Sequence, residues 1–323
     1  MLKILNPPLD SILVNNLDTL WRSAFGKDFV TDVPRSLLTE NAPLPHTVDV
    51  YTKVIEKRFV SGAVAIAGGS FPKLGGLGEV STVPEFRGSG FATEICREVL
   101  HNFFDSSGKA LYLGTTNPSA ARIYSKLGWK YIPKTKLMVN VGKDDSYREF
   151  IEEYFLTVPP YKYRRGEMSA RIPMIPLAIV HSDWDLLDTN IGLLSTLQEE
   201  QESCLGLYRR YDKIRIDGLG EFFTLADGDG RLIGISTAVK KDEGYCLLDG
   251  FTHPLHKYSF IELLKTALDW GEAEGLSSFK MEIADTDQEK AELAAGLGFK
   301  LTDERSVFEG RYISCNTHLF TLN

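Results

Sequence analysis

The chain has 323 residues, of which 43% are hydrophobic and 25% charged, and its formal net charge is −8. This composition is typical of a globular protein and excludes a mostly disordered chain, a collagen-like fibre and a small disulfide scaffold. The negative charge gives no overall attraction for nucleic acid or anionic lipid, so we expect neither as a partner. The length suits two domains better than one.

The four cysteines are scattered, with no C-x-x-C pair and no His/Cys cluster at metal-ligand spacing. We therefore expect reduced thiols and no metal site. No apolar run approaches the ~18 residues that span a bilayer, and no apolar signal segment opens the chain. A soluble, cytoplasmic protein is the expectation.

In chain order, the first part predicts a strand at 2–5, a helix at 10–25, strands at 47–57, 60–68 and 75–82, a helix at 91–104, a strand at 110–115, a helix at 119–127, and closing strands at 129–133 and 135–140. The helix signals are apolar residues at helical spacing, such as Ile95, Val99 and Phe103, and a stop glycine, Gly128.

The pattern weakens between 143 and 172. A charged helix is predicted at 145–155, and the pair Pro159-Pro160 and a short aromatic–basic run, Tyr161–Arg165, indicate a solvated linker. Beyond it the order repeats: a strand at 176–181, a helix at 184–200, a strand pair around the turn 227–230, a strand at 245–252, a helix at 258–273, a strand at 278–283, a helix at 287–295, and a closing strand from 298. We predict two domains, 1–142 and 173–323, joined by the linker 143–172.

The two halves share residues at a constant offset of 170. Leu127-Gly128-Trp129-Lys130 returns as Leu297-Gly298-Phe299-Lys300. The same offset pairs further residues without a gap: Glu79 with Asp249, Thr82 with Thr252, Pro84 with Pro254, Ser89 with Ser259, and Leu113 with Ile283. We interpret the chain as a duplicated domain.

The most informative segment is a strand that ends in a glycine-containing turn, Arg87-Gly88-Ser89-Gly90, just before a helix. Glycines there let backbone N–H groups approach a ligand, and a helix N-terminus favours anions. A P-loop is absent, and a Rossmann fingerprint lacks its third glycine because Thr93 stands there.

The pattern R-x-x-G-x-A after this strand, followed by Asn117, Tyr124 and Leu127-Gly128-Trp129, resembles the GNAT superfamily of N-acetyltransferases. The resemblance is close over roughly residues 45–140. It implies an α/β (α+β) fold of tandem GNAT-like domains, each with a mixed, mostly antiparallel sheet flanked by helices. Two strands, at 78–83 and 110–115, are implied to separate around the pantetheine arm of acetyl-CoA.

The resemblance also implies the site. The expected contacts with coenzyme A are the end of the strand, the turn and helix start, and the asparagine: Val80, Ser81, Thr82, Arg87, Gly88, Ser89, Gly90, Phe91, Ala92, Thr93 and Asn117. A strand N–H near Val80 or Ser81 stabilises the oxyanion. Tyr124 is expected to protonate the leaving thiolate as general acid, and Glu79 to deprotonate the incoming ammonium.

Each assignment has a purely structural alternative. Tyr124 could be a core aromatic and Asn117 a helix cap. Arg87 could hold the turn without touching phosphate, and Glu79 could be a solvated or salt-bridged carboxylate. The histidine pair His253 and His256 has no third ligand nearby, which makes it a poor metal site.

The second copy departs from the motif at the positions that would hold the cofactor: Lys257 for Arg87, Tyr258 for Gly88, Phe260 for Gly90, Glu262 for Ala92, Asp287 for Asn117 and Ala294 for Tyr124. We predict that bulky side chains block its cradle and that its acidic groups repel phosphate. The second domain is thus expected to be degenerate, without cofactor, and to wall off the acceptor pocket.

The predicted function is transfer of an acetyl group from acetyl-CoA, a coenzyme A thioester, to an amine, with a small-molecule acceptor expected. The alternatives are transfer of a different acyl group, a non-catalytic acyl-CoA or metabolite-binding module, and a structural protein without coenzyme A. Acceptor choice would rest with residues 27–45 and the C-terminal half. A monomer is expected, because a tandem chain can mimic a dimer.

Overall fold

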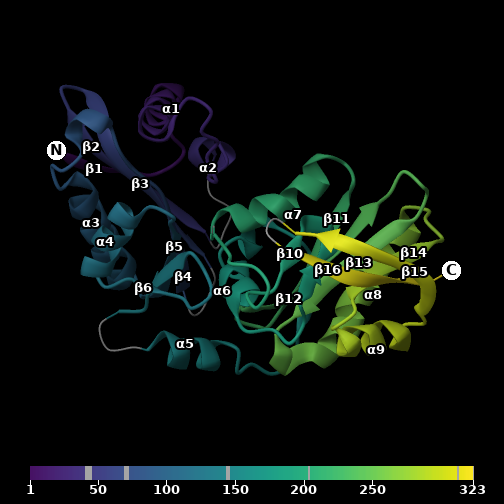
Figure 1. Ribbon diagram of the computed structural model, residues 1–323. Coiled ribbons are helices and arrows are strands. Elements are labelled where there is room, and N and C mark those ends of the chain that lie inside the picture. The colour runs from purple at the N-terminus through teal and green to yellow at the C-terminus, as the bar shows by residue number, and fades with distance from the viewer. Residues whose placement is uncertain (41–45, 69–72, 143–145, 203, 311–312, 323) are drawn as a thin grey trace. The chain divides into compact units, whose positions relative to one another are not determined.

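The computed structural model describes residues 1–40, 46–68, 73–142, 146–202, 204–310 and 313–322 (Figure 1). The chain divides into two compact units. The first comprises Met1–Ile151, Arg171–Ile175 and Glu202–Gly206; the second comprises Glu152–Ala170, Pro176–Gln201 and Leu207–Asn323. Each unit is built around its own seven-stranded mixed sheet with helices packed on it, so the predicted fold class is confirmed.

The sheet of the first unit has the order β1-β2-β3-β4-β5-β7-β6, in which only β4 and β5 run parallel. Its strands are β1 (Leu2–Leu5), β2 (Thr47–Ile55), β3 (Arg58–Gly68), β4 (Lys73–Thr82), β5 (Gly108–Gly114), β6 (Lys130–Tyr131) and β7 (Leu137–Asn140). The helices in this part of the chain are α1 (Ser11–Phe25), α2 (Ser36–Thr39), α3 (Phe91–Asp105), α4 (Pro118–Lys126), α5 (Tyr147–Tyr154) and α6 (Met174–Ile179), with a 3-10 turn at Pro84–Phe86.

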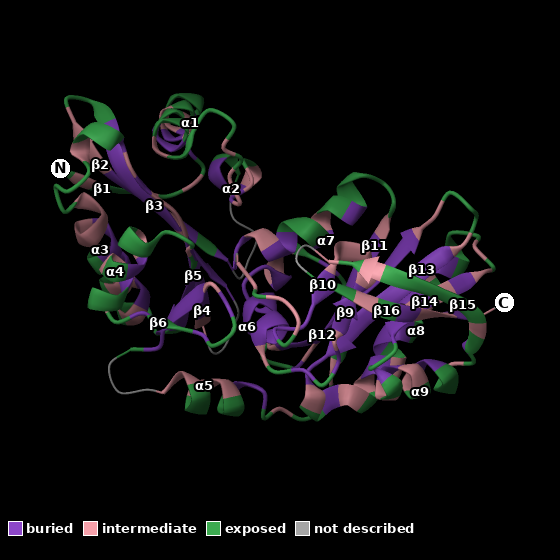
Figure 2. Cartoon of the chain, viewed as in Figure 1, coloured by how far each residue is buried: buried purple, intermediate pink, exposed green. Residues whose placement is uncertain are grey.

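Helices cover both faces of this sheet. On β3, a Cβ at Gly62 would meet Leu20 of α1, whereas Ala63 belongs to the core cluster that contains Ile95 and Val99 of α3. Successive strand residues point to opposite faces, so α1 and α3 lie on opposite sides. Figure 2 shows β3 and β5 mostly buried and exposed residues on α4.

The second sheet has the order β15-β16-β14-β13-β12-β11-β8, and only β13 and β14 run parallel. The strands of this unit are β8 (Lys162–Arg165), β9 (Leu186–Asp188), β10 (Leu193–Leu194), β11 (Gly220–Ala226), β12 (Leu232–Lys240), β13 (Cys246–Thr252), β14 (Phe279–Ala284), β15 (Lys300–Glu309) and β16 (Ser314–Leu322). Its helices are α7 (Gly206–Ile216), α8 (Phe260–Ala273) and α9 (Gln288–Gly296), with 3-10 turns at Met168–Ala170, Thr189–Ile191 and Pro254–Ser259.

The offset of 170 holds in three dimensions. Helix α4 begins at Pro118 and α9 at Gln288, and the glycines that follow them, Gly128 and Gly298, have φ of +99° and +96°. Each pair of parallel strands is followed by this helix, and the residue after each glycine, Trp129 or Phe299, is buried. The same local sequence therefore builds the same corner in both units.

Three sequence predictions in the later part of the chain are wrong. The segment taken as a linker contains, besides the predicted helix at 145–155 (α5), the strand β8, which pairs with β11 inside the second sheet; residues 143–145 lie outside the described residues. The strand predicted at 176–181 is part of α6, because a short apolar run does not distinguish a buried helix from a strand.

The helix predicted at 184–200 is instead β9, a 3-10 turn and β10, and the helix α7 was missed. Gly192, with φ +64°, ends the 3-10 turn. Residues 171–175 and 202–206 also group with the first unit, so the second unit is not one continuous stretch from 173. Among the described residues, no helix is long and apolar enough to cross a membrane.

Candidate active site

The two parallel strands of the first sheet separate partway along their length. In the described residues the ladder between β4 and β5 ends at the pair Gly76–Tyr112, although β4 continues to Thr82 and β5 to Gly114. Beyond Gly76, the edge of β4 that faces away from β3 has no strand beside it. An extended ligand with amide groups can pair with such an edge as an added strand would. The separation is the one that the resemblance implied.

A β-bulge lies in the separated part of β4. The β3–β4 ladder shifts register between the pairs Val64–Gly78 and Gly62–Ser81, and Glu79 within the bulge has φ +54°. A left-handed backbone is uncommon for a residue with a side chain and costs on the order of 1 kcal/mol. Bulges re-aim the neighbouring groups and often lie beside active sites.

Glycines shape the turn from β4 into α3. Gly88 and Gly90 have φ of +84° and +80°, a conformation that residues with a Cβ rarely adopt. A Cβ at either position would meet no atom within 4 Å. The backbone conformation, rather than crowding, therefore requires glycine here, and the space above the turn is open.

Unpaired donors gather at this turn. Within the part of the chain that the structure describes, five backbone N–H groups have no acceptor: those of Gly88, Gly90, Phe91, Ala92 and Thr93. Of residues 88–93, Ser89 is the one whose backbone N–H has a partner: it donates to the Phe86 carbonyl at 3.3 Å. Free N–H groups at a helix N-terminus, together with the positive end of the helix dipole, form an anion site. The turn thus suits a pyrophosphate.

The Arg87 side chain holds this turn in place. Its Nε donates to the Thr82 carbonyl at 3.3 Å, and Nη2 donates to the carbonyl of Ala24, near the end of α1, at 2.9 Å. Both contacts are to backbone, so they tie α1, β4 and the turn together. The structural alternative for Arg87 is therefore realised, while the residue also borders the cleft.

Asn117 caps α4. Its Oδ1 accepts from the backbone N–H of Ser119 at 2.9 Å and of Ala120 at 3.4 Å. Capping uses the oxygen only, which leaves the two amide protons of Nδ2 available as donors. Asn117 borders the cleft, so the capping role and a ligand-binding role are compatible.

These elements enclose a cleft of about 570 Å³. Its lining comes from the C-terminal end of α1, the end of β4, the turn, and the starts of α3 and α4: Ala24, Phe25, Val80, Ser81, Thr82, Phe86, Arg87, Gly88, Gly90, Phe91, Ala92, Thr93, Asn117, Ser119, Ala120 and Ile123. Every residue predicted to contact coenzyme A except Ser89 is in this lining. Sequence reasoning missed the wall from α1; the exposed aromatic Phe25 at the end of an amphipathic helix was the available signal.

Tyr124 lies behind the lining of the cleft. Its side chain is 5% exposed, and its ring packs edge-on against Trp129 with centroids 5.9 Å apart. Burial, with a smaller effect of the nearby Cys96 thiol, raises the pKa of Tyr124 above its usual value. The hydroxyl accordingly stays protonated at neutral pH, and the ring is part of the core.

Glu79 is likewise absent from the lining. Its Oε1 accepts from the Thr31 hydroxyl at 2.5 Å and from the Asp32 N–H at 2.9 Å. Burial raises the pKa of Glu79, opposed by the Thr31 hydrogen bond and assisted by the Asp32 charge. A raised pKa brings a carboxylate closer to the range of a useful general base.

Two segments from later in the chain cover β4 near this carboxylate. A Cβ at Gly76 or Gly78 would come within 2.6 Å of the Leu205 side chain. The buried Arg171 donates through Nη1 to the carbonyls of Asp32 at 3.1 Å and Leu205 at 3.2 Å. These long-range contacts left no local signal in the sequence.

The histidine pair has structural partners. His253 stacks on Phe155 with ring centroids 4.0 Å apart, and burial lowers the pKa of His253 to about 4. His256 Nε2 lies 2.9 Å from the Phe155 carbonyl, and its Nδ1 lies 3.1 Å from the Tyr161 hydroxyl. In the described parts of the chain, no group of three or more potential ligands could hold a metal ion.

Solved structures of acetyltransferases are similar to part of this chain. A spermidine N-acetyltransferase from Vibrio cholerae, in complex with CoA and spermine, is 19% identical, with 50% of this chain and 94% of that chain covered and a TM-score of 0.38. A GNAT superfamily phosphinothricin acetyltransferase from Sinorhizobium meliloti, in complex with AcCoA, is 15% identical, with coverage of 50% and 87% and a TM-score of 0.40. An N-acetyltransferase from Staphylococcus aureus Mu50 is 10% identical, with coverage of 51% and 99% and a TM-score of 0.40.

No curated protein matches the chain. The family model described as an acetyltransferase (GNAT) domain matches residues 58–132. This span begins with β3, includes β4, the glycine turn and α4, and ends just after β6. Residues 58–132 are therefore similar to an acetyltransferase (GNAT) domain.

Proposed function

We propose that the first unit transfers an acetyl group from acetyl-CoA to a small-molecule amine. The observation that carries this proposal is the row of five unpaired N–H groups at the start of α3, directly after the open edge of β4. The N–H groups would bind the pyrophosphate of coenzyme A. The open edge of β4 would bind its amide-containing arm.

In the proposed reaction, the amine nitrogen attacks the thioester carbonyl, a C–N bond forms, and the C–S bond breaks. The backbone N–H of Val80 or Ser81, beside the bulge, stabilises the oxyanion. Tyr124 gives its proton to the departing thiolate, and Glu79 takes the proton of the ammonium through water. Water mediates both proton transfers, because both the Tyr124 hydroxyl and the Glu79 carboxylate lie outside the lining of the cleft.

An amine acceptor fits the charge on this side of β4. Glu79 and Asp32 bring two carboxyl groups together near the bulge, and such a pair favours a cation over an anion. Ile172 and Leu205 would form part of the acceptor wall, because a Cβ at Gly76 would meet both side chains and one at Gly78 would meet Leu205. We assign the transfer to residues 1–142 and keep the second unit as a degenerate, cofactor-free copy.

The test is calorimetric titration of the full chain with acetyl-CoA. Wild type is expected to bind one molecule per chain, and Gly90→Trp to abolish binding by filling the cradle and disturbing its backbone. The matched control is Gly275→Trp in the second unit: Gly275 has φ +83°, is exposed, and has nothing within 4 Å of a built Cβ, as at Gly90. Two sites per chain, or equal loss in the control, would contradict the proposal.

A second candidate is favoured by one observation: neither Tyr124 nor Glu79 lines the cleft. A chain that binds acyl-CoA without transferring the acyl group would bind one molecule in the titration yet release no thiol. A panel of acyl-CoA species with several amines, read by free thiol, separates the candidates. Thiol release with a longer acyl chain but not with acetyl-CoA would indicate a different donor.

A further inference from the structure

The second unit has a strand gap of its own. In its described residues the ladder between β13 and β14 ends at the pair Leu247–Lys280, while β13 continues to Thr252 and β14 to Ala284. This is the arrangement of β4 and β5 in the first unit. Among the described residues, a segment of the chain is bound in the second gap and none in the first.

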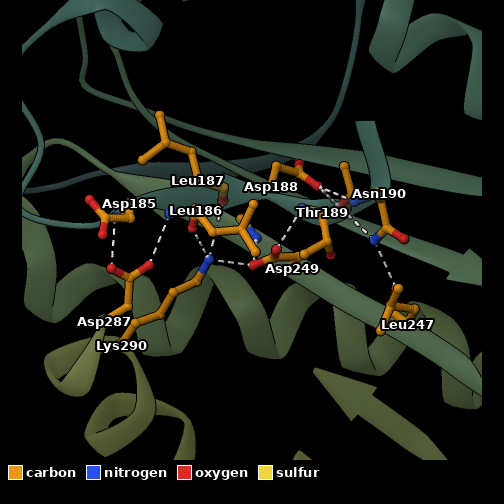
Figure 3. Close-up of polar contacts among 12 residues, drawn as sticks. Asp185, Leu186, Leu187, Asp188, Thr189, Asn190, Leu247, Asp249, Asp287 and Lys290 are labelled. Carbon is orange, nitrogen blue, oxygen red and sulfur yellow. Dashed lines mark hydrogen bonds and ion pairs between the residues drawn. The ribbon is translucent and has the colours of Figure 1, made fainter. Parts of the chain in front are cut away.

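That segment is Asp185–Asn190, which we call the strap (Figure 3). Its C-terminal end is bound to β13: the Thr189 N–H donates to Asp249 Oδ2 at 2.7 Å, and Asn190 Nδ2 donates to the Leu247 carbonyl at 3.0 Å. Leu247 is the last β13 residue paired with β14, so the strap meets the sheet at the apex of the gap.

The N-terminal end of the strap is bound on the β14 side. Asp287, at the start of α9, accepts from the backbone N–H of Asp185 at 2.7 Å and of Leu186 at 3.0 Å, one bond to each carboxylate oxygen. The Leu186 side chain packs with Ala284, the last residue of β14. The strap therefore crosses from one separated strand to the other.

A buried lysine completes the attachment. Lys290 Nζ donates to the carbonyls of Leu186 at 2.8 Å and Leu187 at 3.2 Å and forms an ion pair with Asp249 Oδ1 at 2.5 Å. The side chains of Lys290 and Asp249 are fully buried. A buried ammonium is costly unless its three protons have acceptors, and here two of the three acceptors are strap carbonyls.

The residues that hold the strap occupy cleft positions of the first unit. At the offset of 170, Asp287 matches Asn117 and Lys290 matches Ala120, and both of those line the first cleft. Asn117 caps its own helix, whereas the Asp287 side chain makes no capping hydrogen bond. Since a capping bond stabilises a helix, Asp287 forgoes a normal stabilising contact and binds the strap instead.

We infer that the strap is an internal ligand of the second cleft, seated where the pantetheine arm would lie in a unit of this architecture. Two of the three side chains that bind its N–H and C=O groups, Asp287 and Lys290, replace residues that line the first cleft. The third, Asp249, replaces Glu79. The second unit thus keeps the strand gap but is closed to an acyl-CoA by its own chain. This inference goes beyond the proposed function, and it holds whether or not the first unit transfers acetyl groups.

The test is hydrogen–deuterium exchange of the full chain, read by mass spectrometry. Asp287→Asn installs the first unit's residue; its single acceptor oxygen cannot serve both strap N–H groups. We expect exchange in peptides covering 185–190 to rise at least about tenfold, while α8 peptides stay protected. The control is Asp285→Asn, two residues away, whose carboxylate pairs with His318 and not with the strap.

A second variant keeps the test decisive if Asp287→Asn fails to fold. Asn190→Ala removes the bonds to Leu247 and Thr237 at the other end of the strap and is expected to raise exchange over 188–191. Unchanged strap exchange in both variants would overturn the inference. An equal rise of exchange in the strap and α8 peptides of both variants would also overturn the inference, because the strap would then be an integral part of the core. Neither readout involves coenzyme A, so failure here is distinct from failure of the proposed function.

Discussion

The two units differ most clearly at the turn that follows β4 in the first unit and β13 in the second. In the first unit, Gly88 and Gly90 take left-handed conformations and leave a row of N–H groups unpaired. In the second, Pro254–Ser259 forms a 3-10 helix that runs directly into α8, and the Phe260 N–H donates to the Lys257 carbonyl. Without glycines the turn has no left-handed residue: it passes through a kink at His256 (φ −122°), and the N–H groups of His256 and Phe260 are bonded within the turn.

This corrects the predicted reason for degeneracy. Tyr258 is 78% exposed and Phe260 is fully buried in the core, so side-chain blocking of a preformed cradle is not what distinguishes the second unit. Asp287 does not stand free to repel phosphate either, since it binds two strap N–H groups. Two sequence changes therefore act on the second cleft: the loss of glycine removes the free N–H groups of the turn, and Asp287 binds the strap in the gap.

The largest expected effect tests the strap anchor. Lys290→Met would leave Asp249 buried without its cation, and breaking a buried ion pair costs about 3–5 kcal/mol. Chemical unfolding followed by a probe in the second unit measures this loss. The double variant Asp249→Asn/Lys290→Met should recover part of it, and a loss under about 1 kcal/mol in the single variant would argue against an anchoring role.

The next prediction concerns pH. Burial, then the charge of Asp249, raises the pKa of Asp188 to about 8; Lys290 of α9, Tyr211 of α7 and Thr237 of β12 also face it. Between the unfolded pKa, near 3.8, and about 8, the folded chain holds one more proton than the unfolded chain. The stability contributed by this proton is fully present below the unfolded pKa and is lost as pH rises through that window.

Asp188→Asn cannot titrate at this position, so its stability relative to wild type should increase with pH up to about 8. The slope is at most about 1.4 kcal/mol per pH unit, because one proton is involved. Thermal unfolding of both proteins from pH 5 to pH 9 gives the difference. A difference that is flat with pH would mean that Asp188 is ionised in the folded chain.

A smaller effect is expected in the first unit. Tyr124→Phe should keep the affinity for acetyl-CoA and lower turnover at least roughly tenfold, equal to about 1.4 kcal/mol of barrier, if Tyr124 is the general acid. Removing the hydroxyl keeps the ring against Trp129, so the core is preserved. Unchanged turnover would leave Tyr124 with its core role alone.

The smallest expected effect comes from comparing the residues that precede α4 and α9, Asn117 and Asp287. Asn117→Ala should cost about 1 kcal/mol, because it removes a capping side chain, and should also weaken acetyl-CoA binding. Asp287→Ala removes no capping bond, so its effect should appear in strap exchange and not in acetyl-CoA binding. Equal acetyl-CoA affinity in wild type and Asn117→Ala would leave Asn117 as a cap only.

Prediction from sequence was accurate where signals are local. The elements of residues 1–140 lie where apolar spacing and stop glycines placed them, apart from the short α2, and the residues predicted to contact coenzyme A border one cleft, except Ser89. The same reasoning failed at 184–200, since the side chains that bind its backbone, Asp249, Asp287 and Lys290, come from sixty to over a hundred residues away.

The sequence by itself determined the repeat and the glycine turn, because each depends on residues adjacent in the chain and on their backbone preferences. The separation of β4 from β5 was implied only by the family resemblance, and that of β13 from β14 was found only in the structure. Only the tertiary structure decided which cleft is open. A residue such as Lys290 carries no local sign of its acceptors, and a segment such as Leu186–Asp188 becomes a strap only once strands from elsewhere in the chain surround it. Long-range hydrogen bonds, rather than propensity, made that choice.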